Sequence, residues 1–251
     1  MGKWSVTPQS AATFDEGKLK ISENTSSEDR KITVTYDDQS GNTASTVIIQ
    51  MGRVNMDDYG AYAVDLGLPS GNLWGKMNIG ASGEFNAGPY YQYGKGKRTF
   101  QETSGETAYD GNENPLAGSA DTACMEWTNR WHIPTKEDFE ELIANTTQTW
   151  GIPTGGTLMG AIFSNPTNNN NYVFFPANGF INGGSPEWTT NAIFWTSTID
   201  LGNENKHPFI VEMTKKDENK VNIGIYNHDS IGRTYGLSVR GVIKDYSRMK
   251  Y

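Results

Sequence analysis

The fold is indicated by the phrase VDLGLPSGNLW at Val64–Trp74 and by four phrases that follow it in a fixed order. These are WHIPTKEDFEEL at Trp131–Leu142, VFFPANGF at Val173–Phe180, FWTST at Phe194–Thr198 and GRTYGLSVR at Gly232–Arg240. The chain also has 28 glycines and 12% aromatic residues. This combination predicts a loop-rich protein of short strands, in which aromatic side chains anchor the irregular segments.

Composition narrows the class of protein further. A chain of 251 residues can hold one large domain, or a small domain and a medium one. Its net charge of −8 disfavours binding to nucleic acid backbones, which are also negative. No run approaches the ~18 apolar residues that a membrane span needs. Cys124 is the only cysteine, so neither an intrachain disulfide nor a zinc site of several cysteines can form.

Two helices are predicted in the large C-terminal region. Thr135–Asp138 has the pattern of a capping box, with acidic residues in the first turn of a helix. Phe139, Leu142 and Ile143 follow at the spacing of one buried helix face. A second, shorter helix is predicted over Asp121–Trp127. Trp74, Trp131 and Trp195 are expected in the core, and Trp188 is expected to be exposed.

The rest of this region predicts short antiparallel strands. The four asparagines at 168–171 are expected at a hairpin tip, because asparagine favours turns. A closing meander is predicted over residues 194–198, 207–213, 221–226 and 237–243. One or two early helices followed by such strands define an α+β fold.

The first 52 residues predict a separate β module. Residues 31–36 alternate at period two, Ser40–Asn42 forms a turn, and residues 44–50 are rich in β-branched side chains, so the last two runs predict a hairpin. Residues 53–61 are expected to be a linker and residues 62–251 the large domain. Only three or four strands fit into the module, whereas an immunoglobulin-like sandwich needs about seven.

The five phrases resemble the Fibrobacter succinogenes major paralogous domain over residues 62–243. That family is abundant in Bacteroidetes and is related to the C-type lectin and formylglycine-generating folds. The resemblance implies a C-type-lectin-like domain that acts as a rigid platform for recognition. The preceding segment resembles the second half of a BACON domain, an immunoglobulin-like module linked with carbohydrate or mucin binding. Its missing strands leave open edges, so a neighbouring chain is expected to complete it, either in a homo-oligomer or in a larger assembly.

Catalytic and metal sites are not expected. Formylglycine-generating enzymes need two active-site cysteines, and this chain has one. His132, His207 and His228 lack metal-ligand spacing. The calcium phrases of C-type lectins are also missing, because Ser185–Glu187 and Trp195–Ser197 stand in their place. We therefore expect neither a catalytic residue, nor a metal, nor a cofactor.

The candidate recognition surface is the loop and last strands between Trp188 and Arg233. It offers an aromatic ring and adaptable polar side chains, namely Trp188, Asn191, Asn203, Asn205, His207, Asn227, His228, Asp229 and Arg233. The Tyr90–Arg98 loop, with its aromatic residues and basic cluster, is the next candidate.

The leading hypothesis is a non-enzymatic protein of a phage virion surface, such as a head fibre or decoration protein that faces host glycans or receptors. No signal sequence follows Met1, which fits either a removed signal or a protein that leaves the cell inside a particle. The alternative is an adhesin or carbohydrate-binding lipoprotein domain on the outer surface of a Bacteroidetes cell. A formylglycine-generating-like enzyme is the distant alternative. No nucleic acid partner and no membrane span are expected.

Overall fold

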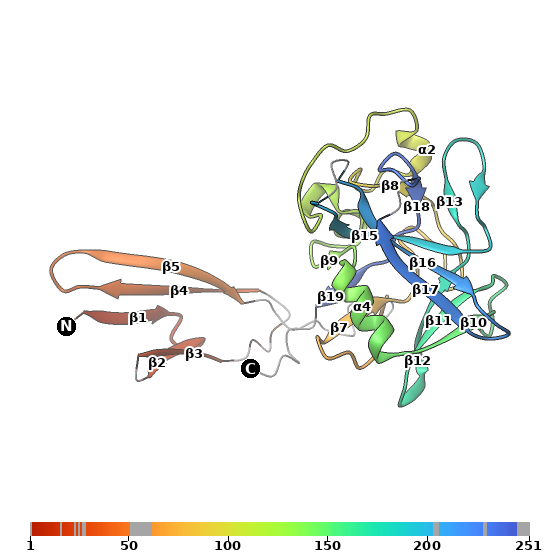
Figure 1. Cartoon of the computed structure of the whole chain (residues 1–251). Helices are drawn as coiled ribbons and strands as arrows, with labels where there is room; N and C mark the ends of the chain where they lie inside the picture. Colours follow the sequence, from red (N-terminus) through yellow and green to blue (C-terminus); the bar gives the residue numbers. More distant parts are fainter. Residues whose placement is uncertain are drawn as a thin grey trace. The chain divides into compact units, whose positions relative to one another are not determined.

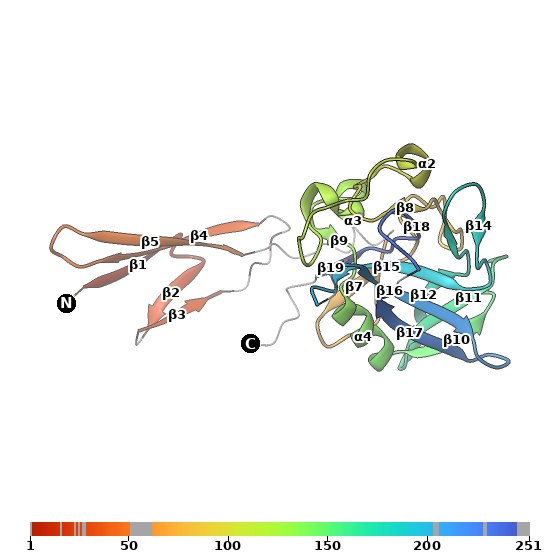
Figure 2. The same cartoon turned by 45° about the horizontal axis from the view of Figure 1, so that its top comes forward.

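The chain forms two compact units, which are drawn in Figures 1 and 2. This computed structural model describes residues 2–15, 17–22, 24, 26, 29–50, 62–202, 206–227 and 230–244. The first unit contains the described residues up to Gln50, and the second contains those from Tyr62 onward. The expected linker, residues 53–61, lies outside the described residues. Both units are built mainly from antiparallel sheets.

The first unit is a three-stranded sheet with a hairpin. The sheet has the order β1-β4-β5, formed by Lys3–Thr7, Arg30–Asp37 and Thr43–Gln50, and the hairpin joins β2 (Ala12–Asp15) to β3 (Lys18–Ile21). The predicted hairpin is confirmed as β4–β5, in which Asp37 pairs with Thr43 and Arg30 with Gln50. Gly41 has a φ of 99° in the turn, a conformation open to glycine.

Alternation along β4 decides which face of this sheet is buried. Ile32 and Val34 are buried, whereas Lys31, the residue before Ile32 in the same strand, points to the opposite face and is exposed. The buried pair packs with Val6 of β1 and with Ala11 and Ala12. Phe14 and Leu19 of the β2–β3 hairpin are partly buried against this small core.

Strand β5 forms one edge of the sheet. Among the described residues it pairs with β4 alone. Its eight residues, TASTVIIQ, include no charged side chain. Val47 and Ile49 face away from the small core and are 47% and 58% exposed. Within the described ranges, this edge therefore presents backbone groups that no further strand pairs, beside exposed apolar side chains.

The second unit contains four small sheets of three or four strands. They have the orders β6-β7-β19-β9, β10-β11-β12, β14-β13-β18-β8 and β15-β16-β17. The strand bounds are Ala63–Asp65 (β6), Asn72–Gly75 (β7), Tyr91–Gln92 (β8), Trp131–His132 (β9), Thr147–Gly151 (β10), Gly160–Asn165 (β11), Asn168–Pro176 (β12), Phe180–Ile181 (β13), Pro186–Glu187 (β14), Ala192–Ile199 (β15), Pro208–Lys215 (β16), Val221–Asn227 (β17), Gly236–Leu237 (β18) and Val242–Lys244 (β19).

The described helices are short and lie in the first half of this unit. They are α2 (Phe100–Thr103), the 3-10 turn η1 (Gly118–Ala120), α3 (Thr122–Glu126) and α4 (Lys136–Asn145). Helix α4 confirms the predicted capping box, since the Thr135 hydroxyl accepts from the Asp138 amide at 3.0 Å and the Asp138 carboxylate accepts from the Thr135 amide at 2.8 Å. Helix α3 confirms the shorter predicted helix. None of the described helices is both long and apolar enough to cross a membrane.

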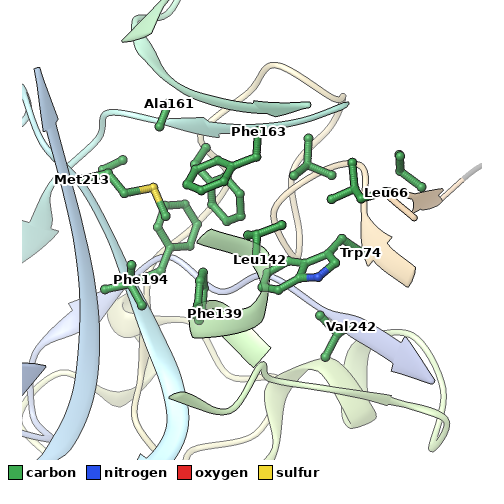
Figure 3. Close-up of a cluster of buried hydrophobic side chains, with 14 of the residues drawn as sticks. Leu66, Trp74, Phe139, Leu142, Ala161, Phe163, Phe194, Met213 and Val242 are labelled. Atoms are coloured by element: carbon green, nitrogen blue, oxygen red, sulfur yellow. The ribbon is translucent and has the colours of Figure 1, made fainter. Parts of the chain in front are cut away.

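The core of the second unit lies between helix α4 and the strands β7, β11, β12, β15 and β16 (Figure 3). Phe139 of α4 meets the Trp74 ring at 5.0 Å, and Phe175 meets Phe194 at 5.0 Å in an edge-to-face contact. Such aromatic pairs add about 0.5–1.5 kcal/mol each to the hydrophobic burial. Trp74, Trp131 and Trp195 are at most 2% exposed, which confirms that they are core residues.

Arg240 is a fully buried cation in this core. Its guanidinium donates to the carbonyl oxygen of Gly75 at 2.9 Å and to that of Phe174, and it lies 4.7 Å from the centre of the Phe175 ring. Burial lowers the pKa of Arg240 to about 9, because the charged form is poorly solvated. The side chain thus ties β7 to β12 through hydrogen bonds to the main chain.

Two sequence predictions were wrong. The asparagines at 168–171 do not form a hairpin tip, because β12 already begins at Asn168. The turn is closed by Asn165 instead, whose side chain accepts from the amides of Thr167 at 2.8 Å and Asn168 at 3.2 Å.

The predicted strand over 237–243 is interrupted. Its residues divide between β18 and β19. In the gap, the carbonyl oxygens of Ser238 and Val239 accept from the amides of Trp195 and Ile79, which belong to different segments. A single continuous ladder is therefore not formed there.

Candidate functional site

Trp188 is a large aromatic residue at the surface of the second unit, and its backbone has a constrained conformation. Its side chain is 45% exposed, as predicted, and its ring meets Phe180 edge-to-face at 5.2 Å. Phe180 is buried and stacks in turn on Tyr235 at 5.5 Å. Trp188 has a φ of 51°, an unusual conformation for a bulky residue. A row of rings therefore supports an exposed indole in a constrained position.

Gly179 makes this position possible. Its φ is +62°, and a Cβ atom at this residue would lie 1.8 Å from the Glu187 carbonyl oxygen. Only glycine allows the Glu187–Trp188 backbone to approach so closely. The segment is closed by two main-chain bonds, from Asn191 N to Trp188 O at 2.8 Å and from Gly179 N to Asn191 O at 2.9 Å.

A surface hollow of about 310 Å³ lies beside this segment. It is lined by Trp188, Thr190, Asn191 and Glu212. The Asn191 amide donates to a Glu212 carboxylate oxygen at 2.6 Å, and the Thr190 hydroxyl donates to the Asn191 side-chain oxygen at 3.1 Å. These bonds link three polar side chains next to an aromatic face.

Strand β16 carries Glu212 to the hollow. Its neighbours Val211 and Met213 belong to the core, so alternation turns Glu212 to the opposite face. Glu212 pairs across the sheet with Gly224 of β17. The Tyr226 ring lies over Gly224, since a Cβ there would be 2.4 Å from a Tyr226 ring carbon. The Tyr226 ring therefore covers Gly224, the residue opposite Glu212 in the sheet.

The predicted recognition residues fall into two groups. Trp188 and Asn191 lie together just before β15, where both line the hollow. His207 and Asn227 lie near the far end of this strand, because β16 and β17 run antiparallel and Ile199 pairs with Pro208. An eight-residue strand spans roughly 23 Å at 3.3 Å per residue, so one small ligand cannot contact both groups. Four further predicted residues, Asn203, Asn205, His228 and Asp229, lie outside the described residues.

Arg233 is turned into the protein. It is 8% exposed, and its guanidinium donates to the carbonyl oxygens of Tyr109 at 2.8 Å, Gly111 at 2.9 Å and Lys206 at 2.6 Å. It also lies 5.6 Å from the centre of the Tyr93 ring. These contacts join two surface loops. Arg233 therefore stabilises the packing of these loops and does not line the hollow.

His207 and Asn227 take part in a polar cluster around Asp200. The Asn227 amide donates to the Asp200 carboxylate at 3.0 Å, and the main-chain carbonyl of His207 accepts from the Asp200 amide at 2.9 Å. Both residues therefore help to connect the end of β15 to β17. Neither lines the hollow beside Trp188.

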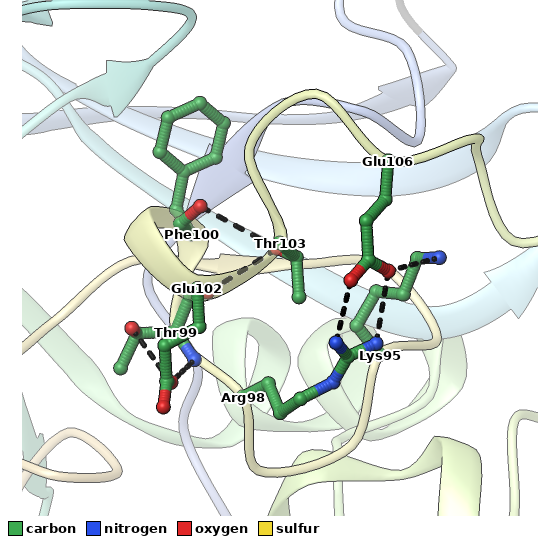
Figure 4. A network of polar contacts seen from close by, with 7 residues as sticks. All are labelled: Lys95, Arg98, Thr99, Phe100, Glu102, Thr103 and Glu106. Carbon is green, nitrogen blue, oxygen red and sulfur yellow. Dashed lines mark hydrogen bonds and ion pairs between the residues drawn. The ribbon is translucent and has the colours of Figure 1, made fainter.

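The Tyr90–Arg98 loop is held by internal contacts. Tyr91 and Tyr93 are buried, which places their rings in the core. Arg98 forms two hydrogen bonds to Glu106, at 2.6 and 2.9 Å, and Lys95 lies 3.2 Å from the same carboxylate (Figure 4). These bonds, with Arg98 contributing most, lower the pKa of Glu106 to about 2. Two of the three cations of this loop, Lys95 and Arg98, are thus paired with the same carboxylate.

Two residues of the hollow were missed by sequence reasoning. Thr190 lies in the predicted surface segment but carries no distinguishing pattern. Glu212 does carry one, because it is the single charged residue within the otherwise mostly apolar stretch PFIVEMT. Such a residue must point away from the core. Its closeness to Asn191 depends on the register between β15 and β16, which the sequence alone does not specify.

The hollow combines an aromatic side chain with groups that can form hydrogen bonds. An exposed aromatic face can stack on the apolar face of a ligand, while the Asn191 amide, the Thr190 hydroxyl and the Glu212 carboxylate can bond its polar groups. Within the described ranges, no group of three His, Cys, Asp or Glu residues is placed to hold a metal ion. Comparison of the chain with family models, curated proteins and solved structures finds no match.

Proposed function

We propose that this protein acts by surface recognition without catalysis, and that its second unit binds a sugar ring in the hollow beside Trp188. The observation that carries the proposal is the constrained, exposed Trp188 ring next to the hydrogen-bonded pair Asn191–Glu212. We further propose a C-type-lectin-like fold for this unit, supported by the resemblance of the five phrases. A protein receptor with a projecting polar or aromatic side chain is the second candidate ligand.

A single site of this kind binds weakly. The hollow, about 310 Å³, lies at the lower end of the range for ligand sites, roughly 300–1,000 Å³, so it accommodates about one ring. A hexose has about 12 heavy atoms, and at about 0.3 kcal/mol per atom they supply about 4 kcal/mol, which corresponds to a Kd near 1 mM. Useful attachment to a surface then requires several copies of the site acting together.

Strand β5 offers a way to bring copies together. It pairs with β4 alone among the described residues, and it carries no charge along its eight residues. Two identical uncharged strands can pair antiparallel without like-charge repulsion. A two-fold axis at Val47 brings the two Val47 side chains together and sets Ile49 opposite Ser45. We therefore propose a second copy of the chain as the partner of this edge, and light scattering over a range of concentrations tests it.

The biological setting that we propose is a phage virion surface, with the second unit facing host glycans or receptors. It is supported by the resemblance to modules of Bacteroidetes proteins and their phages. A bacterial outer-surface adhesin is the alternative, and a formylglycine-generating-like enzyme is the distant one. The neighbouring genes distinguish the first two, since capsid and portal genes indicate a virion and polysaccharide-utilisation genes indicate a cell surface.

Binding to a glycan array, with two tryptophan variants compared, tests the proposed function. Trp188→Ala removes the aromatic face of the hollow and is expected to abolish binding. Trp4→Ala is the matched control, because Trp4 is similarly exposed (49% against 45%) but belongs to the first unit. Equal binding by Trp188→Ala and the unmodified protein, or loss of binding in Trp4→Ala alone, contradicts the proposed site.

A further inference from the structure

The charge of the side chains that line the hollow indicates which sugars can bind there. Glu212 is the only charged side chain among the described residues that line it. Lys215 is the first cation that follows along β16, but it has the same strand parity as the core residues Val211 and Met213 and therefore points to the other face. The lining thus provides a carboxylate with no cation from β16 beside it.

The surroundings strengthen this negative character. Glu187 is exposed on β14, directly before Trp188. The whole chain carries a formal charge of −8. An anionic ligand that stacks on Trp188 would therefore approach the Glu212 carboxylate without a compensating cation among the described lining residues.

The remaining hydrogen-bonding groups of the hollow mostly accept. One Glu212 oxygen accepts from Asn191, and no other described residue donates to the second oxygen. The Thr190 hydroxyl uses its hydrogen on Asn191, which leaves its oxygen as an acceptor. The Asn191 amide keeps one hydrogen to donate. A ligand that matches this set must bring mainly donors, namely hydroxyl or ammonium groups.

We infer that the hollow selects neutral and amino sugars and rejects sugars that carry a carboxylate or sulfate. This inference rests on the proposed function. Hydroxyl groups satisfy the acceptors of Glu212 and Thr190, an ammonium group also pairs with the carboxylate, and an acidic group repels it. Like charges a few ångströms apart near a protein surface weaken binding by roughly tenfold or more at low salt.

Titration of the full-length protein with three methyl glycosides tests the inference. The probes are methyl glucoside, methyl glucosaminide and methyl glucuronide. Saturation-transfer NMR measures the affinity for each probe, and Trp188→Ala is the control for binding at the hollow. The expected order of affinity is glucosaminide, then glucoside, then glucuronide, with roughly tenfold between the last two. Glu212→Gln keeps the hydrogen bond to Asn191 and removes the charge, so it is expected to bring the three affinities together.

The outcomes separate the inference from the proposed function. The inference about charge is overturned if all three sugars bind with equal affinity, or if the glucuronide binds most tightly. If that binding is lost in Trp188→Ala, the hollow is still the binding site. An unchanged order in Glu212→Gln overturns the role of Glu212. Binding that persists in Trp188→Ala, or no binding of any probe at 10-fold above the expected millimolar Kd, overturns the proposed function together with the inference.

Discussion

Substitution of Gly179 by alanine should damage both the stability of the second unit and the hollow beside Trp188. Gly179 has a φ of +62°, which costs about 1–2 kcal/mol for a residue with a Cβ. The new Cβ would also lie 1.8 Å from the Glu187 carbonyl oxygen and 2.8 Å from the Trp188 carbonyl carbon. Relieving such overpacking costs a further ~1–3 kcal/mol. The expected loss in the free energy of unfolding is therefore roughly 2–5 kcal/mol.

Gly118→Ala is the matched control for this effect. Gly118 has a φ of +57°, but apart from its chain neighbours no atom of the described residues lies within 4 Å of the position of its Cβ. Its substitution should cost only the backbone strain, about 1–2 kcal/mol. Urea unfolding followed by tryptophan fluorescence measures both variants, and six of the seven tryptophans lie in the second unit. The reasoning is refuted if Gly179→Ala is no less stable than Gly118→Ala, or if it binds sugar as the unmodified protein does.

Three further predictions concern buried charge, pH and assembly. Arg240→Ala leaves the Gly75 and Phe174 carbonyls without their donor and opens a cavity, so urea unfolding should show a loss of at least about 3 kcal/mol; an unchanged midpoint would contradict this. Burial alone raises the pKa of Asp138, but the ion pair with His132 and the hydrogen bonds from Thr135 outweigh it and hold the pKa below its usual value of 3.8. The stability that this carboxylate adds is thus present above pH 3.8 and lost as the pH falls below it. The loss of unfolding free energy on acidification should therefore be smaller in Asp138→Asn than in the unmodified protein, and equal losses would refute this role of Asp138. Val47→Lys places a charge at the centre of the β5 edge and should dissociate any oligomer in light scattering, whereas unaltered assembly would exclude pairing through that edge.

The elements that sequence reasoning found are those with local signals. Helix α4 begins where the Thr135–Asp138 capping box places it, because both hydrogen bonds form within one turn. The β4–β5 hairpin follows from alternation around a short turn. The hairpin before Tyr172 was predicted, but its tip was placed at the four asparagines. The tip lies at Pro166–Thr167 instead, because Asn165 supplies the turn and the asparagines continue into the strand.

Part of the candidate site could be predicted from local sequence, and the part that depends on strand pairing could not. The exposure of Trp188 follows from its polar, loop-like surroundings. The contact of Asn191 with Glu212 joins residues 21 positions apart, and it exists because β15 and β16 pair in one particular register. The same antiparallel pairing sends His207 and Asn227 to the other end of the sheet, so a single continuous surface was not formed from all the predicted residues.

Mapping a bound sugar by amide chemical shifts tests the central claim most directly. With methyl glucoside added to isotope-labelled protein, the Trp188 indole N–H and the Asn191 side-chain amide should shift together, with a midpoint near 1 mM. The signals of Trp4 in the first unit and of Asn227 at the far end of the sheet should remain in place. Shifts confined to Trp4, or centred on Asn227, would contradict the assignment of the site to the Trp188 hollow.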